Sequence, residues 1–147
     1  MPFKVIISSD KSHVFKKCIE SVDFRVDTPN DAHARSTEIG NIIEINGKIG
    51  TEESTVDLYL WSLLPANDSK SYKKVEVQVI GHQGLILRKV TFPNAFIVDY
   101  AESYTSYDGN GSFYLLLRQK KDKNDAINLE GDTSIMNDED DEENAEQ

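Results

Sequence analysis

The feature that most constrains the fold of this chain is an alternation of apolar and polar residues with a period of two. It is clearest from Lys74 to Ile80, where Val75, Val77 and Val79 alternate with charged or amide side chains. Successive side chains of a β-strand point to opposite faces of its sheet, so this pattern predicts a strand with one buried face. Apolar, β-branched segments of similar character predict further strands at Phe3–Ser9, Phe15–Val26 (two strands), Ile39–Ile49, Leu85–Tyr100 and Ser112–Gln119.

One segment, Ser54–Leu64, has helical periodicity instead. Its apolar residues Val56, Tyr59, Leu60, Leu63 and Leu64 recur at helical spacing and predict one apolar face. Ser54 and Asp57 have the spacing of a capping box, and Pro65 ends the run. A single short amphipathic helix has to pack on something else. The chain is therefore predicted to be mainly β, a small β-barrel or sandwich of antiparallel strands with one amphipathic α-helix packed outside.

Charge divides the 147 residues into two parts. The net charge is −10, yet residues 1–121 contain 15 basic and 15 acidic residues and are neutral. Residues 122–147 contain one basic residue, Lys123, and 11 acidic ones. We therefore expect a folded domain over residues 1–121 and an acidic, disordered tail over residues 122–147. A neutral body with an anionic tail argues against nucleic-acid binding.

Membrane insertion and export by a signal peptide are not expected from the sequence. No apolar stretch approaches the roughly 18 residues of a membrane-spanning helix, so no membrane anchor is predicted. The first ten residues lack the apolar run of a signal peptide, which indicates synthesis in the cytoplasm.

Residues with catalytic or metal-binding chemistry are sparse. Cys18 is the only cysteine and is interpreted as a partly buried strand residue, the alternative being a thiolate activated by the neighbouring Lys16 and Lys17. His13, His33 and His82 are too far apart in sequence to share one local metal site, and no cofactor or metal is predicted. An enzyme is therefore not expected, and an assembly role is favoured.

The order of the predicted elements resembles that of a known family. The segments that carry the resemblance are Ile42–Ile49, the helix Ser54–Leu64, Lys74–Ile80, Val90–Tyr100 and Ser112–Arg118. Together they resemble the haemolysin-coregulated protein of type VI secretion and the tail-tube proteins of contractile phages and bacteriocins, over about residues 3–120. Val90–Tyr100 is the most telling segment, since these families carry a similar apolar-Thr-apolar strand with Asn-Ala before a hairpin.

The resemblance implies a structural subunit with a β-barrel and an external helix. Six copies would close into a ring, and stacked rings would form the inner tube of a contractile injection system, driven through a target envelope by a sheath. Its partners would be itself, sheath and baseplate proteins, and effector cargo, and it would be exported as part of the tube.

The same resemblance implies two sets of functional residues. The loop Asp27–Glu38 is expected to reach an adjacent subunit, the alternative being a mobile surface loop; its interface residues would be Thr28, Pro29, Ala32, Ala34, Arg35, Ser36 and Glu38. The solvent face of the helix would meet the sheath through Glu53, Asp57 and Ser62, the alternative being plain solvent exposure.

Two other functions remain open from the sequence. One is a monomeric β-sandwich that binds a glycan or peptide through a strip of tyrosines near one hairpin, Tyr100, Tyr104, Tyr107 and Tyr114. The other is a tube-related baseplate, hub or cap subunit with the same fold. The acidic tail is expected to keep subunits soluble, to limit premature stacking by repulsion, or to engage a basic partner.

Overall fold

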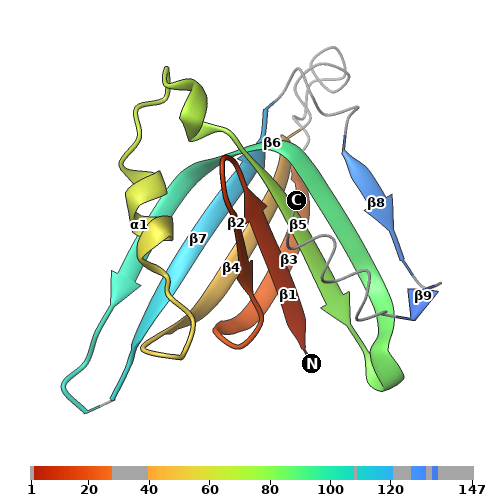
Figure 1. Cartoon of the computed structure of the whole chain (residues 1–147), viewed down its shortest axis with the longest axis horizontal. Coiled ribbons are helices and arrows are strands. Elements are labelled where there is room, and N and C mark those ends of the chain that lie inside the picture. The colour runs from red at the N-terminus through yellow and green to blue at the C-terminus, as the bar shows by residue number, and fades with distance from the viewer. Residues whose placement is uncertain (1, 28–39, 108, 121–126, 132–133, 136–147) are drawn as a thin grey trace.

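The computed structural model describes residues 2–27, 40–107, 109–120, 127–131 and 134–135. One helix, α1 (Val56–Ser62), lies beside an antiparallel sheet of nine strands (Figure 1). The strands are β1 (Phe3–Ser8), β2 (Ser12–Phe15), β3 (Ile19–Asp27), β4 (Gly40–Ile49), β5 (Lys73–Ile80), β6 (Leu85–Ser103), β7 (Gly111–Gln119), β8 (Asn128–Glu130) and β9 (Ser134–Ile135). Short 3-10 turns at Ser69–Ser71 and His82–Gly84 flank β5.

The long strand β6 belongs to both layers of the molecule. Its first half pairs with β5 and its second half, from Ala95 onward, pairs with β7. The pairing order is β2-β1-β5-β6-β7-β4-β3, and in the described part of the chain no pairing joins β2 to β3. The sheet therefore does not close, and it folds over itself where β6 arches (Figure 1). The predicted mainly-β class is confirmed in its sandwich form, with a packed helix.

The arch of β6 coincides with the predicted interruption at Pro93 and Asn94. Lys73 pairs with Ala95 and Val75 with Phe92, so β6 has one extra residue here. Proline has no N–H to give to a ladder and is tolerated at such a bulge. The Asn94 N–H donates to Oε1 of Gln119 (3.2 Å), and the Asn94 carbonyl accepts from the Lys120 N–H (2.9 Å). The bulge thus bends the strand while its backbone groups stay satisfied.

The core lies between the two layers, and the alternation in the sequence points into it. Val75 and Val77 of β5 are fully buried, as predicted. Val79 is only half-buried, whereas Gln78 and Ile80, which alternate onto the opposite face of β5, are buried, so the predicted one-sided burial fails at this end of the strand. The other core residues include Val5, Ile7, Phe15, Cys18, Ile43, Ile45, Val90, Phe92, Ala95, Phe113, Leu115 and Leu117.

The helix is shorter than predicted, and a different face of it is buried. Leu58 and Trp61 join the core, whereas Val56, Leu60 and Leu63 are 63%, 54% and 65% exposed. The predicted apolar face is therefore wrong except at half-buried Leu64. The apolar side chains of this helix project on all sides of its axis, so their spacing alone does not select the buried face. The Trp61 Nε1–H donates to the Ser71 carbonyl at 2.8 Å, which anchors the indole inward.

The start of the helix also differs from the predicted capping box. Thr55, not Ser54, is the N-cap residue, and its side chain makes no capping hydrogen bond. Asp57 faces His13 of β2 instead, with 3.4 Å between Oδ2 and Nδ1. The helix is thus held by its buried residues and by side-chain contacts to the neighbouring hairpin.

Two strands lie within residues 122–147, which were predicted to be disordered. β8 pairs with β6 at Lys89–Thr91, and β9 pairs with β6 at Leu85 and Ile86. The structure differs from the prediction at these residues. Residues 122–126 and 136–147, including the run Asp138–Glu143, lie outside the described residues.

Candidate functional site

The predicted subunit-interface residues lie outside the described residues. Those residues are Thr28, Pro29, Ala32, Ala34, Arg35, Ser36 and Glu38. The structure does describe the two strands that lead into and out of this loop. β3 is the last strand of the sheet and exposes Phe24 and Val26 near its end. The loop therefore leaves from an edge of the sheet, and its role stays a prediction.

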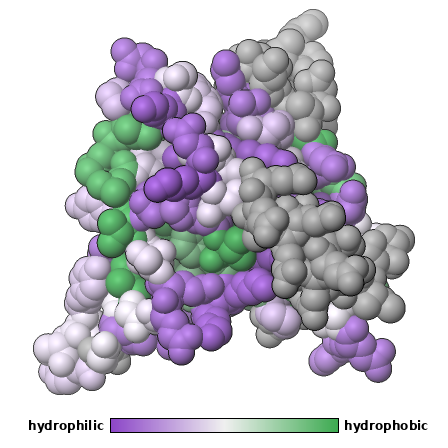
Figure 2. All heavy atoms as spheres, in the orientation of Figure 1, coloured by the Kyte–Doolittle hydropathy of each residue, from purple (hydrophilic) through white to green (hydrophobic). Residues whose placement is uncertain are grey.

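The outer face of α1 carries more apolar surface than the sequence analysis expected. Val56, Leu60 and Leu63 are spaced at i, i+4 and i+7 and are all exposed. Figure 2 shows apolar side chains gathered on the left of the molecule, over the helix. Of the predicted sheath-facing residues, Asp57 and Ser62 lie on α1, Asp57 exposed and Ser62 half-buried. The Ser62 hydroxyl donates to the Tyr59 carbonyl within the helix.

The third predicted helix residue, Glu53, precedes α1 and has a different local role. Its carboxylate accepts hydrogen bonds from the backbone N–H groups of Lys16, Lys17 and Cys18 at 2.6–3.0 Å. Burial by itself raises the pKa of Glu53, but these three hydrogen bonds outweigh it and hold the pKa below its ordinary value. Glu53 thus ties the segment before α1 to the corner between β2 and β3.

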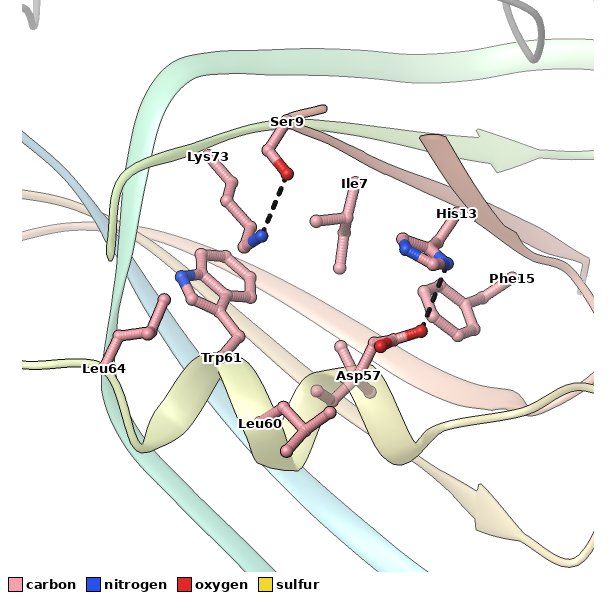
Figure 3. A pocket seen from close by; sticks show the side chains of 10 residues that line it. Ile7, Ser9, His13, Phe15, Asp57, Leu60, Trp61, Leu64 and Lys73 are labelled. Carbon is pink, nitrogen blue, oxygen red and sulfur yellow. Dashed lines mark hydrogen bonds and ion pairs between the residues drawn. The ribbon is translucent and has the colours of Figure 1, made fainter. Parts of the chain in front are cut away.

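A pocket of about 170 Å³ lies between α1 and the β1–β2 hairpin (Figure 3). Apolar side chains form much of its wall: Ile7, Phe15, Leu58, Leu60, Trp61 and Leu64. Two polar pairs flank it. His13 faces Asp57 across the pocket, and the Lys73 ammonium donates to Oγ of Ser9 at 3.0 Å. Lys73 Nζ also lies 5.8 Å from the centre of the Trp61 ring, a cation–π contact.

The polar side chains of this pocket hold α1 against the β1–β2 hairpin, and they are not arranged as a catalytic site. The Ser9 hydroxyl accepts a hydrogen bond from Lys73, and His13 is paired with Asp57, so the two pairs do not form a relay to one nucleophile. Among the residues that the structure describes, no three His, Cys, Asp or Glu side chains are grouped to hold a metal ion. The Cys18 thiol is buried, and burial raises its pKa to about 12.

The four tyrosines proposed for ligand binding do not form one strip. Tyr114 pairs in register with Ala101, so it points to the opposite face of the sheet from Tyr100. Tyr100 is half-buried against Phe113 and donates to Glu102 at 2.6 Å, and Tyr104 donates to the same carboxylate. Tyr107 is 96% exposed near the tip of the hairpin. The arrangement removes the observation that suggested a glycan- or peptide-binding strip.

The contacts that the sequence analysis missed join residues far apart in the chain. Glu53 and Lys16–Cys18 are 35 to 37 residues apart, and no local pattern reports such a contact. For the buried face of α1, the sequence did contain a signal, the single tryptophan of the chain. The predicted apolar face does not include this residue, Trp61. Its size made it the best candidate for the buried side of the helix.

Comparisons with known proteins place this fold among tube proteins. No protein-family model and no curated protein sequence matches the chain. Hcp1 from Flavobacterium johnsoniae is similar in structure, with a TM-score of 0.55 and 19% identity over 92% of this chain and 100% of that one. The described residues contain no helix with the length and apolar character needed to cross a membrane.

Contractile injection systems supply two further similar structures. A chain of the sheath–tube complex of an extracellular contractile injection system, PVC, has a TM-score of 0.53 and 12% identity, covering 88% of both chains. The tube-terminating cap of the anti-feeding prophage has a TM-score of 0.51 and 13% identity, covering 87% of this chain and 88% of that one. The resemblance to Hcp1 and related tail-tube proteins that the order of elements predicted is confirmed at the level of the fold.

Proposed function

We propose that this chain is a structural, non-catalytic subunit that assembles into six-membered rings, stacked as the inner tube of a contractile injection system. The observation that carries the proposal is the likeness to Hcp1 over the whole length of that protein and 92% of this one. Structures from a type six secretion system and from a sheath–tube complex share the fold, which supports a tube role in either kind of machine.

The open sheet supports self-association. β2 and β3 are the two ends of the pairing order, and each offers one side of its backbone to a neighbour. Exposed strand edges promote aggregation unless they are covered. Identical copies that cover one another's edges in a closed cycle give a ring of fixed size. The loop at 28–39, which leaves from β3, is suited to reach the adjacent copy.

The exposed surface of α1 supports contact with a second set of partners, the sheath and baseplate proteins. Its exposed row, Val56, Leu60 and Leu63, is the kind of apolar surface that a partner covers. Asp57 lies on the same helix and offers a charged contact beside that row. Delivery of cargo and export with the tube follow from the tube role.

Electron microscopy of the purified protein tests this proposal. We expect six-fold rings at moderate concentration and stacked tubes at high concentration. The paired substitution Arg35→Ala with Glu38→Ala is expected to impair ring formation, measured by light scattering, if the 28–39 loop bridges subunits. A protein that remains monomeric at every concentration would contradict the tube role.

The likeness to the anti-feeding prophage cap favours one related candidate, a subunit that ends the tube. Such a subunit would form single rings and would not stack. Microscopy separates the two functions, because a cap gives isolated rings at concentrations where a tube protein gives long cylinders.

A further inference from the structure

One edge of β6 is covered by the chain's own C-terminal segment. β5 occupies one side of the first half of β6, and β7 takes the other side only from Ala95 onward. The side that β7 leaves free runs from Leu85 to Asn94. β8 pairs with it at Lys89–Thr91, and β9 pairs with it at Leu85 and Ile86 (Figure 1). This edge is thus occupied by a strand that comes from outside the main domain.

The covering strand β8 is held mainly by its backbone. Its three residues are all exposed, Leu129 at 62%, and only the preceding Ile127 packs partly against the core. Glu130 lies 4.0 Å from Lys89 Nζ, but Lys89 is closer to Glu76, at 3.6 Å. At 4.0 Å, with a half-exposed carboxylate and with Lys89 nearer to Glu76, this ion pair contributes little. With so few buried contacts, β8 is expected to open at a low free energy compared with the core strands.

The position of β8 is nevertheless specific, because Gly131 permits a close approach to β6. A Cβ atom at residue 131 would lie 2.6 Å from the Leu87 carbonyl oxygen and 2.8 Å from Nη1 of Arg88. The carbonyl belongs to the backbone of β6 and does not swing aside as the end of a flexible side chain can. Only glycine therefore lets the segment follow β6 beyond Glu130.

A groove next to β8 offers the side-chain contacts that a docking strand needs. The far end of β3 forms one wall, and β6 with the segment of β8 forms the other; its apolar residues are Phe24, Val26, Val90, Phe92, Ile127 and Leu129. A strand that replaced β8 would gain the free backbone of β6 together with the apolar floor of Val90 and Phe92. Both are buried in the described structure.

We propose that the outer edge of β6 is a docking surface for a β-strand of a second copy of this chain, and that residues 127–131 occupy it until that copy displaces them. The inference rests on the proposed self-assembly. The second copy is the occupant because the same molecule carries the complementary element, an edge strand, β3, with Phe24 and Val26 exposed. A covered edge on one copy and an exposed edge strand on the next form a head-to-tail contact.

Gly131→Leu tests the inference without changing charge or the main domain. We expect faster hydrogen exchange of the residue 85–91 amides in the monomer, and assembly that starts several-fold sooner by light scattering. The matched control is Gly109→Leu, because a Cβ at Gly109 would meet nothing within 4 Å. The control should assemble as the unaltered chain does. Equal assembly rates for Gly131→Leu and the unaltered chain would overturn the inference.

The reverse test locks the strand in place. Thr91 and Asn128 are cross-strand partners, so Thr91→Cys with Asn128→Cys is designed to form a disulfide between β6 and β8. The native Cys18 is buried and should not interfere. Assembly should be strongly slowed in the oxidised protein and restored by reductant. If the unaltered chain forms tubes and the locked chain forms them equally fast, the inference is wrong while the tube role stands. If no form assembles, both are wrong.

Discussion

Glu53 shows how one carboxylate organises a corner of the molecule. Three consecutive backbone N–H groups between β2 and β3 converge on it, and strand pairing cannot satisfy them at this turn. The neighbouring Glu52 makes a simpler contact, an exposed ion pair with Lys17 at 2.7 Å. The two adjacent residues thus provide a direct comparison between a multiply hydrogen-bonded carboxylate and an exposed one.

Glu53→Gln is expected to lower the free energy of unfolding by about 1–2 kcal/mol at pH 7, since it removes charge-assisted hydrogen bonds. The pKa of Glu53 is lowered in the folded protein, so its contribution is full above the unfolded-state pKa and is lost as pH falls through the folded one. Urea unfolding at pH 7 and at pH 3 measures this. The gap between variant and unaltered protein should narrow in acid.

Glu52→Gln is the control for that experiment, because the Glu52–Lys17 pair is exposed and should contribute little at either pH. An equal loss of stability in both variants would show that the backbone contacts of Glu53 have no special role.

Cys18 gives a second prediction at the residue scale. Its thiol is fully buried and its pKa is raised to about 12, chiefly by burial and then by the charge of Glu53. The thiolate is the reactive form, so a thiol reagent at pH 8 should leave the native protein unmodified. One equivalent should react after denaturation in guanidinium. Rapid labelling of the native protein would show that the corner opens readily.

At the scale of elements, α1 demonstrates the limit of periodicity as a guide. The helix carries apolar residues on all sides, and its neighbours decide which ones are buried. Leu58 and Trp61 face the core, while the adjacent Leu60 lies at the edge of the pocket and is 54% exposed. The strands were easier to predict, because their alternation matches a sheet with one buried face, and because the turn at Tyr107–Gly111 marks the β6–β7 hairpin.

Trp61→Ala and Leu60→Ala compare the two faces of α1. Trp61→Ala should destabilise the protein by about 3–5 kcal/mol, because it empties a buried site and leaves the Ser71 carbonyl without its donor. Leu60→Ala should change stability by about 0.5 kcal/mol or less. Thermal unfolding by circular dichroism measures both. Similar losses would indicate that Leu60 is buried in the protein in solution.

At the scale of the whole molecule, the sequence alone predicted the class, the order of most elements and the neutral body. It could not reveal β8, since an exposed strand of three residues has no periodic signal and pairs with residues 37 to 41 positions earlier. The candidate surfaces were predicted less completely than the fold. Glu53 was assigned to the helix, whereas its partners lie across a corner that only the three-dimensional structure brings together.

Removal of residues 136–147 separates the charge of the tail from its strand pairing. This deletion takes away seven acidic residues and keeps β8 and β9. If repulsion between tails restrains stacking, the shortened chain should polymerise faster at low salt and at the ordinary rate at high salt, where charges are screened. Light scattering at the two salt concentrations measures the effect. A rate that is the same at low salt would exclude repulsion.

The arch of β6 also has a mechanical consequence. Since one continuous strand is hydrogen-bonded into both layers, a force that tends to slide one layer past the other is resisted by the covalent backbone of β6 as well as by packing in the core. The two layers are thereby joined into a single stiff body. A cylinder built from such subunits would transmit axial thrust from one ring to the next with little shear inside each subunit.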